Sequence, residues 1–582
     1  MENKKVLLSV KDLHVKFRVR GRILTAIRGI SLDFYENESV AIVGESGSGK
    51  SVFTKTFAGM LDANGFIDNG SIIFNDEELA DTCVNYDARG KRLVANVAAK
   101  LDKLSKLELG AKTFKAMEAL KQEKKDREGL SAEETKKLTD KISEMQFQRT
   151  ELFNQRQTVD RKNEKERYKN LGKEIKSLDV QIEDLRKQEK KVAQEHKTAV
   201  VNDKAYNAAF AEKLAALKKE YETQIMGEIS QKTKERNLEI AKEVYLSVGR
   251  YGYTQQSKFV TKLLKCFKVA MENGADLYDG EVRNQIFDQV VFRVRYLDET
   301  EKQLHGTCVL NLAKVNYAKD WTKIRGGKIA TVFQDPMTSL NPIITIGKQI
   351  TSVIMKHQDC SELEARARAL EMMHKVGIPN PEKRFDDYPF QYSGGMRQRI
   401  VIAIALSCQP KILICDEPTT ALDVTIQAQI LKLIKDLQKE FGYTIVFITH
   451  DLGVVANVAD RVAVLYAGQV IELGTCEEVF YDPRHPYTWA LLSSLPQLAQ
   501  RNTKLYSITG TPPSLYNKIV GDAFAPRNPY CLKVDTLVEP PLFQITDTHF
   551  AKTWLEDPRA PKVQKPEIIE NIHEKLVDAF NI

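Results

Sequence analysis

The sequence predicts an α/β fold with a mostly parallel core sheet, interrupted by a large helical insertion, and three observations lead to this prediction. A glycine-rich turn, Gly44 to Ser51, follows the apolar run SVAIV and precedes a run suited to a helix, VFTKTFAGML. A second apolar run, KILIC, ends in the two acids Asp416 and Glu417, where parallel sheets present functional side chains. Between these runs, residues 101–240 contain no proline and are rich in Lys, Glu and Gln, which favours long helices.

Composition excludes several classes of protein. The chain has 582 residues, of which 42% are hydrophobic and 28% charged, enough for several folding units. Its longest apolar run, Ile400 to Leu406, is too short to cross a bilayer, and the start MENKKVLLSV lacks the apolar region of a signal peptide, so we expect a cytosolic chain. Eight cysteines without a C-x-x-C pair indicate reduced thiols rather than disulfides or a zinc ribbon.

The net charge of +7 does not by itself indicate nucleic acid. Residues 101–240 hold 32 basic and 27 acidic residues, which supply +5 of that charge. Dense charge of mixed sign is typical of a solvated helical surface rather than a phosphate-binding stripe. We therefore expect no nucleic-acid partner.

The composition changes along the chain predict four segments. Residues 1–80 form the first part of the α/β unit, with an antiparallel β subdomain over 6–40, and residues 321–475 form its second part, with a helical subdomain over about 343–405. Residues 81–320 are the insertion, and residues 476–582 are a proline-rich extension.

Two different parts are expected within the insertion. A helical, partly coiled-coil part spans 95–245, and a small α/β piece spans 245–318. A short heptad seam runs from Leu171 to Val192, and a break over 198–203 is expected to reverse the chain so that two helices pack antiparallel.

The glycine-rich turn has the pattern G-x-x-x-x-G-K-S in its required context between strand and helix, which predicts a P-loop. Its backbone N–H groups would surround phosphate oxygens, Lys50 would add a positive charge, and the Ser51 hydroxyl could ligate Mg²⁺. At the second site, Asp416 would hold Mg²⁺ through water and Glu417 would polarise the attacking water. The predicted nucleotide-binding residues of the loop are Gly44, Glu45, Ser46, Gly47, Ser48, Gly49, Lys50, Ser51 and Val52.

Further motifs make the resemblance to ABC ATPases specific. In order along the chain, VFQDPMTSLNP, YSGGMRQR, ICDEPTTALD and FITHDL are similar to that family's Q-loop, signature, Walker B with D-loop, and switch histidine. The resemblance implies a RecA-like core that binds ATP and Mg²⁺. It also implies that His450 contacts the γ-phosphate, Gln334 senses Mg²⁺ and the lytic water, and Asp423 is the D-loop acid. The implied signature residues are Ser393, Gly394, Gly395 and Met396. Phe17 lies where the family places an aromatic that stacks on adenine, although a strand phenylalanine is equally suited to the core.

The tail narrows the resemblance to one subfamily. DPRHPYTWALLSSLP, TGTPPSL and FAPR, together with YPFQYSGGMRQR and DEPTTALDVTIQAQI, are similar to the D-type ATP-binding subunit of oligopeptide and dipeptide importers. This resemblance implies a peripheral protein on the cytoplasmic face of the membrane. It implies as partners a second, F-type ATPase, two permease subunits and an external peptide-binding protein. An importer of nickel or another small solute with a similar ATPase is the alternative.

Two departures from the subfamily are visible. The cysteines that typically hold a [4Fe–4S] cluster in this tail are replaced, because the corresponding places read Gly521-Asp522 and Arg527-Asn528-Pro529, so no iron–sulfur cluster is expected.

The insertion is the second departure. A coiled coil between P-loop and signature is also the plan of DNA-tethering ATPases of the SMC and Rad50 type, but there the Q-loop precedes the coiled coil, whereas Gln334 follows it here. We expect the insertion either to dock on a partner protein or to be a spacer.

Overall fold

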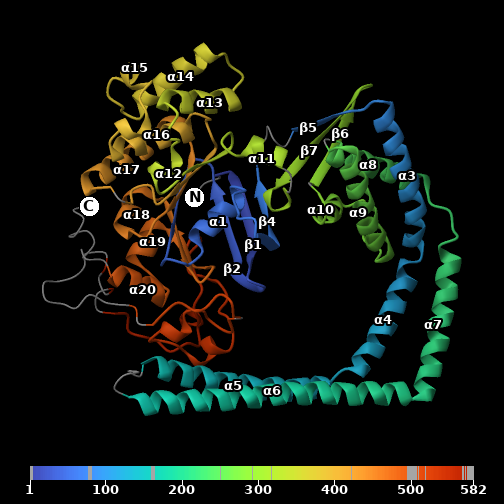
Figure 1. Cartoon of the computed structure of the whole chain (residues 1–582). Coiled ribbons are helices and arrows are strands. Elements are labelled where there is room, and N and C mark those ends of the chain that lie inside the picture. Colours follow the sequence, from blue (N-terminus) through green and yellow to red (C-terminus); the bar gives the residue numbers. More distant parts are fainter. Residues whose placement is uncertain are drawn as a thin grey trace. The chain divides into compact units, whose positions relative to one another are not determined.

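The computed structural model describes residues 4–75, 81–158, 164–249, 251–291, 293–315, 318–420, 422–494, 508, 510–517, 519–566, 569 and 572. The chain forms two compact units. Unit 1 comprises residues 1–73 and 315–582, and unit 2 comprises residues 74–314. Figure 1 shows both units.

The core of unit 1 is a sheet in the order β13-β14-β12-β11-β3-β10-β9-β8. Its central pairs, β11 with β3, β3 with β10, β10 with β9 and β9 with β8, are all parallel. The strands are β3 (Ser39–Val43), β8 (Ile329–Val332), β9 (Ile412–Asp416), β10 (Thr444–Ile448), β11 (Arg461–Tyr466), β12 (Gln469–Thr475), β13 (Phe543–Gln544) and β14 (Phe550–Ala551). Strands β3 and β10 are buried along their whole length, and all but the first residue of each is apolar. The predicted α/β fold with a parallel core is confirmed.

An antiparallel β subdomain accompanies this core, as predicted. β1 (Val6–Val19) pairs with β2 (Arg22–Tyr35), and β4 (Gly65–Phe74) lies beside β1. Alternate residues of β1 and β2 are buried, which is the pattern of strands with one covered face.

Helices cover the sheet, and a group of them forms the predicted helical subdomain. In that subdomain α13 packs on α14 and on α16, and Ile346, Ile350, Ala369 and Ile400 belong to the same core cluster as the sheet. The helices of unit 1 are α1 (Lys50–Phe57), α11 (Ala318–Ile324), α12 (Pro336–Ser339), α13 (Ile346–His357), α14 (Glu362–Lys375), α15 (Pro381–Arg384), α16 (Gly394–Leu406), α17 (Val424–Phe441), α18 (Leu452–Val458), α19 (Cys476–Tyr481) and α20 (Pro486–Ser493).

The described residues from α20 onward have little regular structure but remain packed on the core. Tyr487 and Phe524 are fully buried, and their rings contact Tyr466 at the end of β11 with centroid distances of 4.7 and 5.3 Å. The extension is therefore part of the cassette rather than a separate tail.

Unit 2 contains a globular part larger than the predicted α/β piece over 245–318. Its core joins residues of α3 (Ala88–Leu109) and α8 (Gln231–Val248) with α9 (Tyr253–Glu272), α10 (Gly280–Asp288), β5 (Asp81–Asn85), β6 (Arg293–Glu299) and β7 (Gln303–Asn311). Val94, Leu101, Ile240 and Val244 are essentially buried there. These apolar residues recur at helical spacing, so each charge-rich helix still buries one face.

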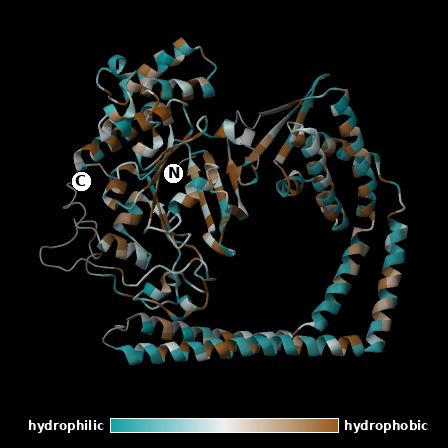
Figure 2. Cartoon of the chain, in the orientation of Figure 1, coloured by the Kyte–Doolittle hydropathy of each residue, from teal (hydrophilic) through white to brown (hydrophobic). Residues whose placement is uncertain are grey.

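The remaining helices of unit 2 are long and mostly hydrophilic (Figure 2). They are α4 (Ala111–Glu128), α5 (Ala132–Thr158), α6 (Lys165–Asn202) and α7 (Lys204–Gln224). α5 packs along α6, buries Leu171, Ile175 and Ile182 on that helix, and is joined to it by the Arg149–Asp179 ion pair at 2.5 Å. The apolar seam of α6 thus packs against α5. That the two helices form a supercoiled coiled coil stays a prediction.

The break predicted over 198–203 is confined to Asp203, because residues 198–202 still belong to α6, and the predicted pairing across the break is wrong. Asp203 caps α7 by accepting a hydrogen bond from the Tyr206 N–H at 3.0 Å. α7 then packs mainly on α4, where Lys124 donates to Asn207 at 2.8 Å, and α6 packs mainly on the preceding α5. Residues 159–163, between α5 and α6, lie outside the described residues.

Within the part of the chain that the structure describes, no helix combines the length and the apolar character needed to span a bilayer.

Candidate functional site

The turn between β3 and α1 contains glycines in positions that a larger residue would not fit. Gly44 lies against the neighbouring strand β11, and a Cβ atom at this position would stand 2.2 Å from the carbonyl oxygen of Leu465. Gly49, the residue before the helix, has a φ of 103°, in the region that favours glycine. The free N–H groups at the start of α1 therefore face the same space as the loop.

Lys50 is the first residue of α1 and its side chain folds back over the loop. Its Nζ atom donates to the carbonyl oxygens of Gly44 at 2.7 Å and Glu45 at 3.1 Å. Burial lowers the pKa of Lys50, while the carboxylates of Glu417, Asp416 and Glu45 oppose this shift. The Ser48 hydroxyl of the same loop is buried and has no hydrogen-bond partner among the described residues. The loop thus offers a cation and an unused donor.

The two acids at the end of β9 reach the loop from the adjacent part of the sheet. The Ser51 hydroxyl donates to Asp416 Oδ1 at 3.2 Å. Burial raises the pKa of Asp416, and the hydrogen bond from Ser51 together with the charges of Lys55 and Lys50 opposes that rise. A hydroxyl oxygen and a carboxylate oxygen therefore meet beside the loop, a donor set that suits Mg²⁺.

Glu417 joins three motifs that are far apart in the sequence. Its carboxylate accepts hydrogen bonds from Gln334 Nε2 at 3.0 Å and from the Thr420 hydroxyl at 3.0 Å, and it lies 3.1 Å from His450 Nδ1. Its backbone has a φ of 47°, and its N–H donates to Ile448 at the end of β10. A strained backbone held by a strand end is a common feature of functional sites.

Lys50, Ser51, Gln334, Glu417 and His450 line one cleft of about 620 Å³, whereas Asp416 is not among its lining residues. The lining combines the P-loop with the acid, the glutamine and the histidine just described, and adds an apolar wall from the β subdomain. The lining residues are Phe17, Val19, Leu24, Ala26, Ser46, Gly47, Gly49, Lys50, Ser51, Val52, Asp62, Gln334, Glu417, His450 and Leu515. Phe17 is 8% exposed and stands on that wall.

The signature and the D-loop acid are not part of this cleft. Ser393 is exposed and caps α16 by accepting from the Met396 N–H at 3.4 Å, with Gly394 and Gly395 in the first turn. Asp423 is also exposed and caps α17, accepting from the Ile426 N–H at 2.9 Å. The sequence motifs singled out the signature residues and Asp423. In this chain, neither lines the cleft that contains Lys50.

Several contacts of the site had no separate motif in the sequence analysis. Thr420 lies within the motif ICDEPTTALD, and its hydroxyl donates a hydrogen bond to Glu417. Asp62 also lines the cleft, but it belongs to no motif that would have predicted this. Leu515 belongs to the TGTPPSL segment, and its backbone carbonyl accepts from the Thr25 N–H at 3.1 Å. The extension therefore reaches the cleft itself.

Comparison with known proteins agrees with this geometry. The sequence profile of the ABC transporter family matches residues 27–246 and 294–420, and that of the oligopeptide/dipeptide transporter C-terminal region matches residues 471–534. The oligopeptide transport ATP-binding protein AmiE of Streptococcus pneumoniae serotype 4 is 64% identical over 266 residues, which are 46% of this chain and 75% of AmiE.

Two further relatives are similar over the same extent. The oligopeptide transport ATP-binding protein OppD of Bacillus subtilis is 58% identical over 263 residues, or 45% of this chain and 74% of OppD. The dipeptide transport ATP-binding protein DppD of Lactococcus lactis subsp. cremoris is 56% identical over 268 residues, or 46% of this chain and 76% of DppD. This chain therefore belongs to the ABC transporter family, as an ATP-hydrolysing subunit that carries the C-terminal region of the oligopeptide and dipeptide transporters.

Proposed function

We propose that this chain hydrolyses ATP in the cleft between its P-loop and Glu417 and thereby powers an importer of oligopeptides or dipeptides. The observation that carries the proposal is the convergence of Lys50, Gln334, Glu417 and His450 on one cleft. Ser46 and the N–H groups of the loop bind phosphate oxygens, whereas the Ser48 side chain is buried and Ser48 is not among the residues that line the cleft. Phe17 faces the adenine.

The Mg²⁺ that accompanies ATP fits the donors beside the loop. Ser51 and Asp416 already meet at 3.2 Å, and Gln334 reaches the same side of the cleft through its contact with Glu417. When bound, the ion neutralises phosphate charge. Glu417 accepts a proton from the attacking water, while Gln334 orients that water and His450 donates toward the γ-phosphate.

A second ATPase subunit completes the site. Because Ser393 to Met396 and Asp423 lie outside the cleft of their own chain, we assign them to the nucleotide held by the partner's P-loop. The partner is an F-type subunit in this proposal, and the isolated chain is a poor ATPase. Closure of the two cassettes on two ATP molecules then moves the permeases.

The helical subdomain offers a docking place for a permease. A groove of about 450 Å³ runs beside α13 and α14, with Ile343 at 81% and Tyr388 at 39% exposure on its rim, and Phe390 stacks on Tyr388 while 70% exposed. The groove itself is lined by both charged and apolar side chains, and the exposed apolar residues beside it favour a protein partner. The two permeases place the chain on the cytoplasmic face of the membrane, and an external peptide-binding protein delivers the cargo to them.

Reconstitution tests the proposed cargo. In vesicles that contain this chain, its partner ATPase, the two permeases and the external binding protein, ATP hydrolysis should rise several-fold when a mixture of short peptides is added. The control is the same preparation with Ni²⁺ instead of peptides, which should leave the rate at its basal value. Stimulation by Ni²⁺ without stimulation by peptides would instead support the small-solute importer.

The absence of an iron–sulfur cluster stays a prediction. The resemblance puts Asp522 and Asn528 at two of the cysteine positions that typically hold the cluster, and both residues are buried. Asp522 accepts from the Phe524 N–H at 3.0 Å and Asn528 accepts from the Tyr530 N–H at 2.9 Å, so these side chains hold the local turns by hydrogen bonds. The thiol of Cys531 stands close by in sequence, and burial raises its pKa to about 12, which disfavours the thiolate that iron requires.

The insertion, in our proposal, docks on a cytosolic partner and adds nothing to the chemical step. It forms a compact unit with its own core, and among the described residues those that line the cleft all belong to unit 1. Replacement of residues 81–314 by a Gly/Ser linker should therefore leave the Kd for Mg-ATP within about threefold of the full chain, measured by titration calorimetry. Complete loss of binding in a deletion protein with a cooperative thermal transition would show that the insertion belongs to the catalytic unit.

A further inference from the structure

An arginine of the C-terminal extension forms an ion pair with the P-loop. The two terminal nitrogens of Arg527 contact the carboxylate of Glu45, the second residue of the loop, at 2.8 and 3.1 Å. The Arg527 side chain is 4% exposed and also donates to the Tyr466 hydroxyl at 3.2 Å. This is a two-point pairing of a guanidinium with a carboxylate, which has defined geometry as well as charge.

A second bond from the extension reaches the same loop residue. The backbone N–H of Glu45 donates to the Tyr487 hydroxyl at 2.8 Å. Tyr487 is fully buried at the start of α20 and packs against Tyr466. The extension therefore fixes both the backbone and the side chain of Glu45.

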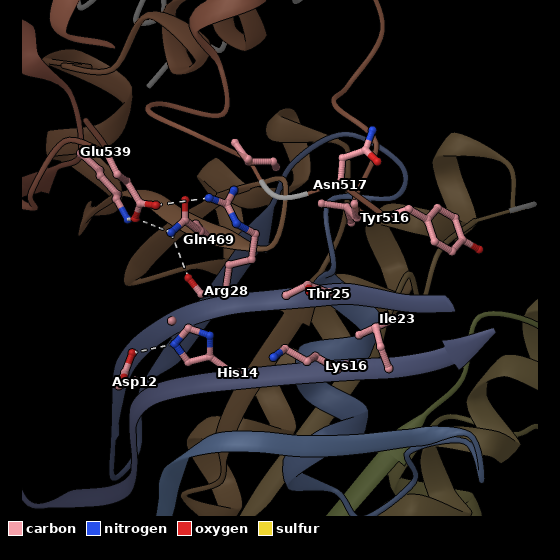
Figure 3. A pocket seen from close by; sticks show the side chains of 14 residues that line it. Asp12, His14, Lys16, Ile23, Thr25, Arg28, Gln469, Tyr516, Asn517 and Glu539 are labelled. Atoms are coloured by element: carbon pink, nitrogen blue, oxygen red, sulfur yellow. Dashed lines mark hydrogen bonds and ion pairs between the residues drawn. The ribbon is translucent and has the colours of Figure 1, made fainter. Parts of the chain in front are cut away.

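A third connection passes through the turn between β11 and β12. The Gly468 N–H donates to the Ser48 carbonyl of the P-loop at 2.9 Å, and the Gly468 carbonyl accepts from the Arg28 N–H at 2.8 Å. On the far side of this turn, Glu539 of the extension accepts from Gln469 at 2.7 Å and from Arg28 at 3.2 Å (Figure 3). The extension thus supports the loop at both Glu45 and Ser48.

The charge of Glu45 makes the arginine important for nucleotide binding. Glu45 shares the loop with Lys50, and its carbonyl oxygen accepts from Lys50 Nζ. Without a partner, its carboxylate would attract Lys50 away from the phosphates and would repel their negative charge. A charge left unpaired in a partly buried place is more costly than the original pair.

We propose that Arg527 is a positioning residue for ATP binding: it neutralises and orients Glu45 so that the P-loop and Lys50 are ready for the phosphates. The inference rests on the proposed nucleotide site at Lys50. It assigns to the oligopeptide-type extension a task in the nucleotide site of its own chain.

Mg-ATP titration of the full chain tests this role. Arg527→Met should weaken binding about tenfold, because the carboxylate of Glu45 is then unpaired. The double variant Glu45→Gln with Arg527→Met should recover to within about threefold of the wild type, because the unpaired charge is gone while the packing of the arginine is still lost. The matched control is Arg484→Met, an arginine of the same extension that pairs with Asp482 and Glu556, and it should bind normally.

The outcomes separate this inference from the function on which it rests. Normal binding by a folded Arg527→Met protein, or a double variant as weak as the single one, would overturn the inference. If Arg527→Met does not fold, Arg527→Lys keeps the charge without the two-point geometry and should bind a few-fold more weakly, and normal binding would again overturn it. A Lys50→Ala protein that binds Mg-ATP normally would contradict the proposed site itself. If the Lys50→Ala protein loses binding while the Arg527 variants bind normally, only the role of Arg527 is rejected.

Discussion

Replacement of Glu417 by Gln is expected to stop ATP hydrolysis at this chain's site while leaving ATP binding intact. In the wild type, Gln334 and Thr420 each donate a hydrogen bond of 3.0 Å to the Glu417 carboxylate. A glutamine side chain has the same shape, and its amide oxygen can still accept both bonds. It cannot take a proton from water at neutral pH. The loss of one group that acts only in the transition state costs about 10² to 10³ in rate.

The measurement is the rate of phosphate release by the assembled transporter. Because the partner ATPase has a site of its own, the partner's catalytic carboxylate is removed in every arm, so that the rate reports this chain. The control is Glu382→Gln, which alters a glutamate that also lies 3.1 Å from a histidine nitrogen, that of His374, but on an exposed surface. Hydrolysis at the wild-type rate by Glu417→Gln would show that Glu417 is not the base.

Local sequence patterns predicted most of the site because each motif has its own strand end or helix start. The P-loop was recognisable from a strand, a turn and a helix within 20 residues. Gln334 and Glu417 are 83 residues apart, and their contact depends on the parallel pairing of β8 with β9. Nothing in the local sequence predicts this pairing, and only the order of the family's motifs indicated the contact. The Arg527–Glu45 pair joins residues 482 positions apart, and no periodicity or spacing indicates such a contact.

The insertion shows the same limit for helices. The apolar positions Leu171, Ile175 and Ile182 revealed that α6 has a face to bury, and the structure buries all three. Periodicity identifies a face but not the helix that covers it. The covering helix is α5, which precedes α6, and not α7 beyond the break at Asp203.

Replacement of Lys50 by Ala is expected to abolish most of the affinity for ATP. Lys50 is 7% exposed and burial lowers its pKa, yet three nearby carboxylates favour its charged form, so the loop keeps a cation where water is largely excluded. In this structure the Lys50 ammonium bonds two loop carbonyls, and both bonds can be exchanged for phosphate oxygens. Hydrogen bonds to charged groups contribute about 1.5 to 3 kcal/mol each.

A loss of that size corresponds to a Kd for Mg-ATP about 10- to 100-fold higher, or more if both bonds are lost. The control is Lys439→Ala, which removes a lysine in the last turn of α17 that does not line the cleft, and its Kd should stay within about threefold of the wild type. Both proteins should keep their thermal transitions near the wild-type temperature, since Lys50 lies in the first turn of α1 and alanine favours a helix. Unchanged affinity in a folded Lys50→Ala protein would mean that ATP is held elsewhere, because a cation beside the phosphates cannot be removed without effect.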